Sequence, residues 1–544
     1  MSPCGTRATR FEAGALGELL AVTGNDTAPV RGLEPLLLAV FLGALGFHLW
    51  AVLGRLGAPL LEAHAFRQTQ TAITVYWLLR GGPWLDYETP VLGPPWAIPF
   101  ELPLYQWTVA MVVRATGLAL DPAGRIVSEA FFLATLLPCW LTLHELGVTR
   151  ALRWPFLALL VVSPLYVFWS RTFMIESTAL CLGWAFAAAA LAHAKRPSAG
   201  RAGLAIAFGA LAAGAKITTF LGFEALVAGV LLHRAWRHRW RGGRLVAGAA
   251  VLGLPLLVGA AWVWHTDQVR AENPLAAGFI TSDAMHAWTF GTWEQRLSAD
   301  TWRSFYTVKA RDVLGVPLIV LAALVGVGLA RRRIGLFVAA VLLFLLPLVL
   351  FVNLHLVHDY YTYANGCFLV AAVGVAVLAL LEAGGWRRWG GVVLLLAAVL
   401  AGGGGYLRDR RPTQLRAVPD LGRSELARAV RASTHPSDVL VVYGEDWSSV
   451  LPYYLERRAV MDRGARDPAA PPELAGALDP LGPPMQAALR RVGMDRVAAL
   501  LACKGTRQQD ALLRRLLAAL ELEGARRVPT RRCDVYFRSR SEPG

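Results

Sequence analysis

The sequence predicts an α-helical, polytopic membrane protein that carries a small α/β domain at its C-terminal end. Hydrophobic residues make up 55% of the 544 residues and charged residues only 17%, a balance typical of membrane proteins. Apolar runs of roughly 17–23 residues recur, each long enough to cross a hydrocarbon core of about 30 Å. After residue 410 these runs give way to short strand-like and helix-like segments. The expected parts are therefore an N-terminal segment 1–33, a membrane domain 34–409 and a C-terminal domain 410–544.

The membrane domain is expected to contain about eleven spans. They are predicted near 34–54, 124–146, 152–169, 174–194, 202–215, 218–233, 245–264, 312–330, 335–353, 362–382 and 388–406. The net charge of +16 comes largely from arginines in short connections between spans, a pattern that indicates cytoplasmic loops and not a nucleic-acid surface. With these connections and the N-terminus in the cytoplasm, the C-terminal domain and the loops 55–123 and 265–311 lie outside.

Residues 103–118 are apolar but short, and Arg114 interrupts them. Counting them as a span would reverse the side of every later loop and place the arginines outside. We therefore predict a membrane-surface or re-entrant helix here.

The C-terminal domain shows the alternation of a small α/β fold. Strands are predicted at 438–443, 496–503 and 533–538, with helices at 447–457 and 508–521 and a proline-rich loop at 468–484. Cys503 and Cys533 fall at the end and the start of two of the strands. An extracytoplasmic compartment permits a disulfide between them, and two buried free thiols are the alternative.

Several ionisable or polar groups lie in or beside the apolar segments, all on the predicted outer face. They are Glu176, Lys216 and the run His358, Asp359, Tyr360 and Tyr361. Such groups are costly at membrane depth and usually face a shared cavity. Lys216 has a simpler alternative, since a lysine near a span end can extend to the interface. Together they indicate one extracytoplasmic site.

The first outer loop, 55–123, carries the densest polar chemistry. Residues 62–80 are predicted to form an amphipathic helix on the membrane, with His64, Arg67, Gln68 and Thr71 on one stripe. The stripe is either a solvated face or a recognition surface for a phosphate or sugar, for which arginine is the preferred planar donor.

Three carboxylates follow in the segment 85–107 of the same loop. Asp86, Glu88 and Glu101 stand among prolines, glycines and aromatic residues, a composition that suits a sugar-binding surface. Each acid taken alone is as well explained as a helix cap or an ion-pair partner.

The order of these motifs resembles the GT-C glycosyltransferases, polytopic enzymes that use polyprenyl-phosphate sugars. This group of enzymes includes protein O-mannosyltransferases, lipid A aminoarabinose transferases and bacterial enzymes that decorate lipopolysaccharide. The matching pieces are H-x-(W/F)-R-Q-x-x-T-A from His64 to Ala72, F-E-x-P-L-Y from Phe100 to Tyr105, S-P-x6-R-x2-M-x-E from Ser163 to Glu176, Lys216 in an interrupted helical pair, and H-D-Y-Y from His358 to Tyr361. The resemblance covers residues 34 to about 410, and the C-terminal domain matches only as a variable appendage.

The chain departs from this family at one functional position. Many relatives begin the first-loop helix with an Asp-Glu pair, where this chain has Phe66 and Arg67, and Gln70 stands where close relatives have Asp. The catalytic base therefore stays open, with Glu88, Glu101, Glu176, Asp359 and His64 as candidates and Asp86 in the same acid cluster.

The resemblance implies attack of an acceptor hydroxyl on the anomeric carbon of a lipid-linked sugar, with inversion. Arg67, Gln68, Arg171 and Lys216 are the candidates for binding the donor phosphate. Glu176 follows Arg171 at i+5, so the two either meet at a helix junction or face separate partners. His358 and Asp359, with Tyr360 beside them, contact substrate or ligate a divalent metal such as Mn²⁺ or Zn²⁺ together with Glu101.

The implied partners are a polyprenyl-phosphate sugar, membrane lipids and an envelope glycolipid or protein acceptor, and the implied location is the bacterial inner membrane with a periplasmic site. The outer loop 265–311, with His286, Trp288, Trp293 and Trp302, is expected to cap the acceptor side. The alternatives are a lipid-linked-sugar transporter, an O-antigen ligase or polymerase, and a non-catalytic glycan-binding or assembly subunit. A transporter predicts internal repeats, and the first-loop motif has no second copy.

Overall fold

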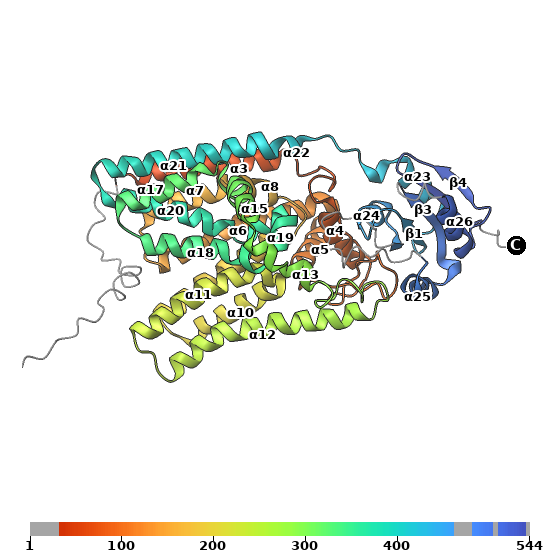
Figure 1. Ribbon diagram of the computed structural model, residues 1–544, viewed down its shortest axis with the longest axis horizontal. Helices are drawn as coiled ribbons and strands as arrows, with labels where there is room; N and C mark the ends of the chain where they lie inside the picture. The colour runs from red at the N-terminus through yellow and green to blue at the C-terminus, as the bar shows by residue number, and fades with distance from the viewer. Residues whose placement is uncertain (1–31, 462–480, 504–509, 540–544) are drawn as a thin grey trace, which may run out of the picture.

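The protein is an elongated helical bundle with a small mixed domain at one end (Figure 1). The structure, a computed structural model, describes residues 32–461, 481–503 and 510–539. Most of the predicted N-terminal segment 1–33 and of the proline-rich loop lies outside these residues. We call the end of the bundle that carries the C-terminal domain the domain end, and the opposite end the far end.

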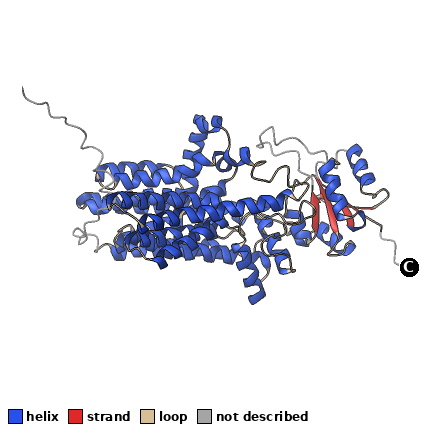
Figure 2. Cartoon of the chain, turned by 90° about the horizontal axis from the view of Figure 1, so that it is seen from below, coloured by secondary structure: helices blue, strands red, loops and turns tan. Residues whose placement is uncertain are grey.

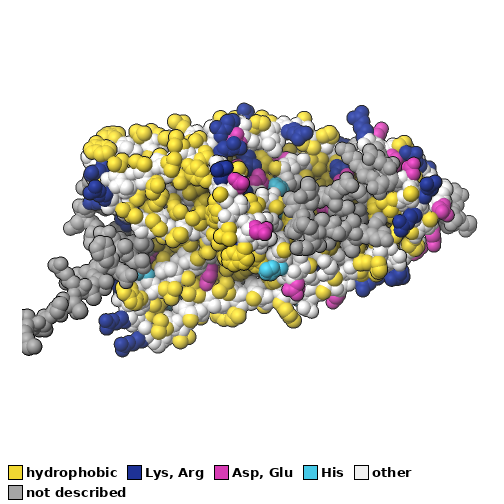
Figure 3. All heavy atoms as spheres, in the orientation of Figure 1, with side chains coloured by type: hydrophobic (Ala, Val, Ile, Leu, Met, Phe, Trp, Pro, Cys, Tyr) yellow, Lys and Arg dark blue, Asp and Glu magenta, His cyan; other side chains and the backbone are white. Residues whose placement is uncertain are grey.

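All eleven predicted spans coincide with helices. The membrane domain is built from α3 (Glu34–Leu53), α6 (Leu120–Glu145), α7 (Arg150–Val162), α8 (Pro164–Trp169), α9 (Glu176–Lys195), α10 (Ala199–Ala215), α11 (Ile217–Arg237), α12 (Gly243–Ala271), α16 (Ala310–Leu314), α17 (Leu318–Ala330), α18 (Ile334–Leu350), α20 (Gly366–Ala383) and α21 (Gly385–Gly405). Within the described residues, seven helical stretches are long and apolar enough to cross a membrane, or eight if the pair bent by 85° between Leu314 and Leu318 forms one span. The chain is a multi-pass membrane protein, and hydrophobic side chains dominate the surface of the bundle (Figure 3).

The length criterion gives fewer spans than predicted because several helices are interrupted. Pro164 starts α8 directly after α7, since proline lacks the backbone N–H that a continuous helix needs. The stretch Ala199–Arg237 is apolar enough to count as one candidate span but is divided at Lys216, whose backbone is extended. Phe220 of α11 stacks against Phe186 of α9, and Gly209 of α10 lies against the same ring. The chain therefore folds back at Lys216 into two helices, as predicted.

The arginine-bearing connections gather at the far end of the bundle. Two ion-pair sets join neighbouring connections there: Arg333 with Glu382, and both Lys195 and Arg196 with Glu145. Lys and Arg side chains are visible at this end in Figure 3. The predicted cytoplasmic connections thus share one end, and the polar loops share the other.

The first outer loop folds into two helices at the domain end, α4 (Ala65–Leu79) and α5 (Leu104–Thr116). The predicted helix 62–80 is present, but most of α4 is buried between α5, α6 and the C-terminal domain, so its stripe is not a solvated face. The 13-residue α5, in the segment predicted to be re-entrant or at the surface, is not among the candidate spans.

The C-terminal domain is a five-stranded mixed sheet with helices around it (Figure 2). Its strands are β1 (Val439–Tyr443), β2 (Arg458–Met461), β3 (Val497–Cys503), β4 (Arg526–Pro529) and β5 (Cys533–Phe537), in the order β2-β1-β3-β5-β4. Its helices are α23 (Glu425–Ser433), α24 (Val450–Leu455), α25 (Pro483–Val492) and α26 (Asp510–Ala519). The three predicted strands are confirmed, whereas β2 and β4, of four residues each, were too short to be recognised by alternation.

Cys503 and Cys533 are opposite each other on the antiparallel pair β3 and β5 and form a disulfide. This resolves the open choice between a bridge and two thiols.

The C-terminal domain is joined to the first outer loop by backbone hydrogen bonds. Residues 90–93 pair with β2: Ala459 N donates to Pro90 O at 3.0 Å, and Met461 N donates to Val91 O at 3.0 Å. On the other side of the loop, Tyr453 and Tyr454 of α24 donate to the Asp121 carboxylate at the start of α6. The C-terminal domain is therefore packed directly against the first outer loop.

Candidate functional site

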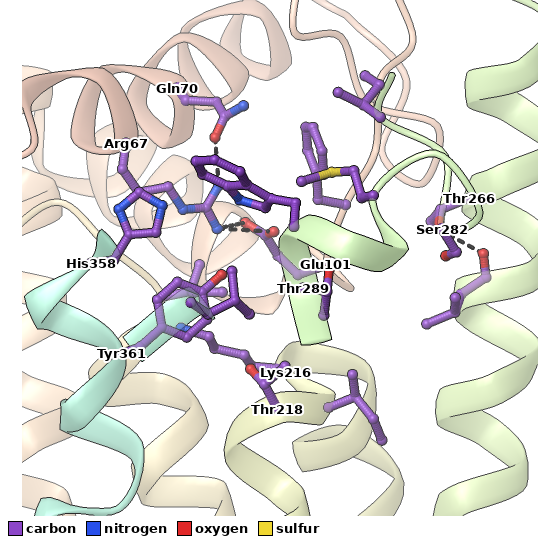
Figure 4. A pocket seen from close by; sticks show the side chains of 18 of the residues that line it. Arg67, Gln70, Glu101, Lys216, Thr218, Thr266, Ser282, Thr289, His358 and Tyr361 are labelled. Carbon is purple, nitrogen blue, oxygen red and sulfur yellow. Dashed lines mark hydrogen bonds and ion pairs between the residues drawn. The ribbon is translucent and has the colours of Figure 1, made fainter. Parts of the chain in front are cut away.

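A cavity of about 520 Å³ lies at the domain end, where the outer loops meet the helix ends. Its walls come from α4, from the turn between α10 and α11, from α12, from the loop 265–311, from the segment 354–361 and from the loop after β1. Figure 4 shows Arg67, Glu101, Lys216, His358 and Tyr361 pointing toward this common space. The predicted single site at the outer ends of the spans therefore corresponds to one cavity.

Arg67 and Glu101 form the charged wall of the cavity on the side of the first outer loop. Arg67 Nη2 lies 3.1 Å from Glu101 Oε2, and its Nη1 donates to Gln70 Oε1 at 2.6 Å. Gln106 Nε2 holds the other carboxylate oxygen of Glu101 at 3.0 Å. Gln70 therefore orients the arginine. The guanidinium is fixed at the cavity surface before any ligand binds.

Lys216 supplies a second cation, because the helix break places its side chain at the apex between α10 and α11. Its Nζ lies 2.8 Å from Glu176 Oε2 and 4.3 Å from the centroid of the Tyr361 ring. The side chain of Lys216 is 11% exposed, so it lines the cavity and does not extend to a membrane interface. Glu176 lies behind it, and its other oxygen, Oε1, is buried without a hydrogen-bond partner.

His64 and Asp359 form an oriented pair beside these cations. His64 has a left-handed backbone at the start of α4, and its Nε2 lies 2.9 Å from Asp359 Oδ1. Arg410 Nη1 binds the other oxygen of Asp359 at 2.7 Å. Burial alone would raise the pKa of Asp359, but His64 and Arg410 hold it well below its ordinary value. With Nε2 facing a carboxylate, the proton on neutral His64 belongs on Nε2 and Nδ1 is left as the basic nitrogen.

His358 and Tyr360 lie next to this pair. The rings of His64 and Tyr360 are 4.9 Å apart, and those of His64 and His358 are 5.5 Å apart. Burial, followed by the proximity of His64, lowers the pKa of His358 to about 3, which keeps the His358 ring neutral near pH 7. The H-D-Y-Y run therefore supplies a neutral ring and two tyrosines to the cavity, together with the carboxylate that orients His64.

Six predicted site residues are not part of the cavity lining. Glu176 and Asp359 contact the lining residues Lys216 and His64 from behind, and four others have partners elsewhere. Asp86 pairs with His265 at 2.7 Å, and Glu88 pairs with Arg458 at 2.7 Å, so the three acids of the segment 85–107 do not cluster. Gln68 is fully buried, accepts from Phe173 N and donates to Ala63 O. Its amide joins α4 to the segment before α9.

Arg171, the fourth, belongs to a buried ion triad that sequence reasoning missed. Its Nη2 lies 2.9 Å from Glu62 Oε2, and Arg125 Nη1 lies 2.6 Å from Glu62 Oε1. Burial alone would raise the pKa of Glu62, but the two guanidinium groups hold it at about 2. Glu176 and Arg171 thus face separate partners, one of the two arrangements predicted. Glu62 precedes the family motif by two residues, and no spacing signal linked it to Arg125.

The predicted metal set of His358, Asp359 and Glu101 does not assemble. Asp359 is turned to His64 and Arg410, and Glu101 is turned to Arg67. Among the described residues, the group with three ligand atoms close enough for an ion is Glu445 with Cys503 and Cys533, and those two sulfurs form the disulfide. Within the part of the chain that the structure describes, the donors of the predicted set therefore do not come together around one ion.

Two further parts of the lining come from the loop 265–311 and from the C-terminal domain. The loop 265–311 contributes Trp288 to the cavity, in keeping with its expected capping position, whereas Trp293 is 76% exposed. The C-terminal domain contributes Asp446 and Trp447. Trp447 was predicted to start the helix 447–457, but α24 begins at Val450 and Trp447 lies in the loop before it. These two residues reach the cavity because the C-terminal domain packs on the outer loops. A local sequence pattern cannot predict that packing.

The fold is that of known glycosyltransferases. The crystal structure of ArnT from Cupriavidus metallidurans bound to undecaprenyl phosphate matches with a TM-score of 0.57 at 15% identity, over 93% of this chain and 98% of that one. The same protein in the apo state gives 0.55 at 16% identity, over 93% of this chain and 98% of that one. Arabinofuranosyltransferase AftD from Mycobacteria gives 0.50 at 15% identity, over 91% of this chain but only 37% of its own length. No protein-family profile matches the chain, and no curated protein matches it. The predicted GT-C fold is thereby confirmed.

Proposed function

We propose that this GT-C-fold protein is a glycosyltransferase that moves a sugar from a polyprenyl-phosphate donor to an extracytoplasmic hydroxyl, with inversion. The observation that carries the proposal is one cavity at the ends of the membrane helices that combines two fixed cations with an oriented histidine. The similarity to ArnT, crystallised with undecaprenyl phosphate, supports a lipid-linked donor.

The donor phosphate binds between Lys216 and Arg67. The polyprenyl chain must stay in the membrane, so the phosphate enters from the bundle side, where Lys216 lies at a helix break. Both cations already face carboxylates, so their positions cost little reorganisation when an anion arrives. The polyprenyl phosphate is a good leaving group. The side chains of Lys216 and Arg67 stabilise the negative charge that develops on it as it departs.

His64 accepts the proton of the acceptor hydroxyl, and Asp359 positions its ring. Asp86 and Glu88 lie outside the cavity lining, Glu176 lies behind Lys216, and both oxygens of Glu101 are within hydrogen-bond reach of Arg67. Of the predicted bases, His64 lines the cavity and presents a ring nitrogen turned away from its carboxylate partner. An imidazole oriented by a carboxylate is a suitable general base near pH 7.

In the reaction the acceptor oxygen forms a bond to the anomeric carbon as the bond from that carbon to the phosphate oxygen breaks. The electron pair of the broken bond leaves with the polyprenyl phosphate, and the hydroxyl proton moves to Nδ1 of His64. Attack opposite to the leaving group inverts the anomeric carbon.

The test uses the purified full-length protein in detergent with a panel of radiolabelled polyprenyl-phosphate hexoses and pentoses. Release of polyprenyl phosphate is measured with total envelope lipid as acceptor. We expect His64→Gln to lower kcat by about 10²–10⁴-fold. We expect Lys216→Met and Arg67→Ala to lower kcat/KM for the donor by about 10²–10³-fold.

Arg303→Ala is the matched control, because Arg303 is on the outer loop 265–311, 76% exposed and away from the cavity lining. It should keep wild-type kinetics. Binding of the donor by wild type without any turnover would refute the proposal in favour of a glycan-binding or assembly subunit. Full activity in His64→Gln would refute the assignment of the base.

The proposed location is the bacterial inner membrane, with the far end in the cytoplasm and the cavity and the C-terminal domain in the periplasm. The basic connections at the far end support this orientation. The disulfide at the domain end supports it independently, since disulfides persist in oxidising compartments.

A further inference from the structure

One wall of the cavity is aromatic and comes from four separate segments. Trp447, in the loop after β1, lies 4.9 Å from the ring of Phe66, 5.5 Å from that of Phe279 and 6.3 Å from that of Phe100. All four rings line the cavity, and Trp447 is half-buried. The carboxylate-bearing Asp446 precedes it and also lines the cavity.

The backbone of this loop has a shape that sets the position of the indole. Gly444 and Asp446 both have positive φ values, 86° and 54°, between β1 and α24. Asp tolerates the left-handed region better than most residues. The turn is therefore built to bring the residue after Asp446 over the cavity, and the packing of Trp447 against three rings holds it there.

We assign the aromatic wall to acceptor binding because of its position in the fold. The polyprenyl chain of the donor lies along the membrane helices, so the donor phosphate occupies the end near Lys216. Trp447 belongs to the C-terminal domain, beyond the helix ends (Figure 1). The other cap residues on this side, Trp288 and Thr289, come from the loop 265–311. A group that enters from outside the membrane therefore meets Trp447 first.

The chemistry of the wall favours a carbohydrate. A sugar ring offers an apolar C–H face that packs on an aromatic ring and hydroxyls that donate to a carboxylate, which matches Trp447 with Asp446. One common way to bind a peptide acceptor is strand addition at a sheet edge. The sheet edge nearest the cavity is β2, and residues 90–93 already pair with it.

We propose that the acceptor is a carbohydrate and that Trp447, with Asp446 beside it, is the residue that selects and positions it. This inference rests on the proposed glycosyl transfer and narrows the acceptor to one chemical class. Trp447 acts as a stacking platform for the acceptor sugar, so that the attacking hydroxyl lies between His64 and the anomeric carbon.

The kinetic test compares Trp447→Ala and Trp447→Phe with wild type. The acceptor probe is the oligosaccharide obtained by deacylating total envelope glycolipid, and a serine- and threonine-rich peptide is the competing acceptor. We expect Trp447→Ala to raise KM for the oligosaccharide about tenfold, about 1.4 kcal/mol of binding, with KM for the donor unchanged. Trp447→Phe should restore most of the affinity. Trp293→Ala, an exposed tryptophan on the same side, is the matched control and should behave as wild type.

A binding measurement separates this inference from the proposed function. Saturation-transfer difference NMR with the free oligosaccharide should show transfer from aromatic protons to sugar C–H groups in wild type and in Trp293→Ala, and loss of that transfer in Trp447→Ala. If no donor is turned over, the proposed function fails, and this binding result still supports or overturns the carbohydrate site. Transfer of sugar to the peptide alone, or an unchanged KM in Trp447→Ala, overturns the inference. If Trp447→Ala does not fold, the same comparison is made with Trp447→Leu, which removes the ring but keeps an apolar side chain, and with Asp446→Asn. Unchanged KM values for the oligosaccharide in both variants overturn the inference.

Discussion

Substitution of Glu62 by glutamine removes the one carboxylate that neutralises two buried arginines, and we expect a large loss of stability. The side chains of Arg125 and Arg171 are 0% exposed, and that of Glu62 is 5% exposed. The two guanidinium groups lower the pKa of Glu62 from 4.5 to about 2. At 1.36 kcal/mol per pKa unit, this shift corresponds to about 3 kcal/mol of stability near pH 7. Breaking a buried ion pair typically costs 3–5 kcal/mol, which agrees in size.

The assay is the thermal unfolding midpoint of the purified protein in detergent, for wild type, Glu62→Gln and the exposed control Glu34→Gln. Glu34 pairs with Arg150, whose side chain is 74% exposed, so loss of that pair should cost well under 1 kcal/mol. Because the pKa of Glu62 is lowered on folding, its contribution is full above about pH 4.5 and is lost as the pH falls toward 2. The difference between wild type and Glu62→Gln should therefore shrink over that window.

The unfolding midpoint, measured together with KM for the donor, also tests the role of Arg171, which the family resemblance assigned to the donor phosphate. In the structure Arg171 binds Glu62 through both of its terminal nitrogens. We expect Arg171→Gln to lower the unfolding midpoint about as much as Glu62→Gln, with KM for the donor unchanged. An unchanged midpoint together with a raised donor KM in Arg171→Gln would refute this reasoning and restore the phosphate-binding role.

Two further predictions concern the disulfide and the neutral histidine. Replacement of Cys503 and Cys533 by serine opens a bridge with a sequence separation of 30 residues, and we expect a loss of about 3–4 kcal/mol of stability in the C-terminal domain, measured as protease resistance with and without reductant. Equal resistance of wild type and the double variant would contradict this. Because the pKa of His358 is lowered to about 3, its ring stays neutral at every pH above that value. His358→Gln should therefore leave the shape of the pH–rate profile between pH 5 and 8 unchanged, and the loss of a titration step near neutrality in this variant would show that His358 carries a proton during turnover.

Much of the site was predictable because its residues carry local signals. Lys216 interrupts an apolar run, and a charge at that depth has to face a cavity or a partner, so its position follows from the cost of burial. His64 and Arg67 belong to a recognisable motif after the first span, and the cavity contains both. The alternation of apolar and basic segments likewise placed the connections at one end.

The roles within the site were less predictable because they depend on long-range partners. Asp86, Glu88 and Glu101 are close in sequence, but each binds a different partner, and only Glu101 reaches the cavity. Sequence spacing cannot distinguish them, because a loop rich in proline and glycine has no fixed period. His64 was one of several candidate bases in the sequence, and its contact with Asp359, 295 residues away, distinguishes it from the others.

The sequence by itself therefore determined the membrane class, the helices, their alternation, three of the five strands of the C-terminal domain and most of the residues around one outer site. These features depend on local hydrophobicity and charge, which a single chain displays directly. Only the tertiary structure decided that Arg171 pairs with Glu62 and that Trp447 closes the cavity. Both depend on how the first outer loop and the C-terminal domain pack on the bundle, through contacts between residues about 110 and 380 positions apart, as in the pairs Glu62–Arg171 and Phe66–Trp447.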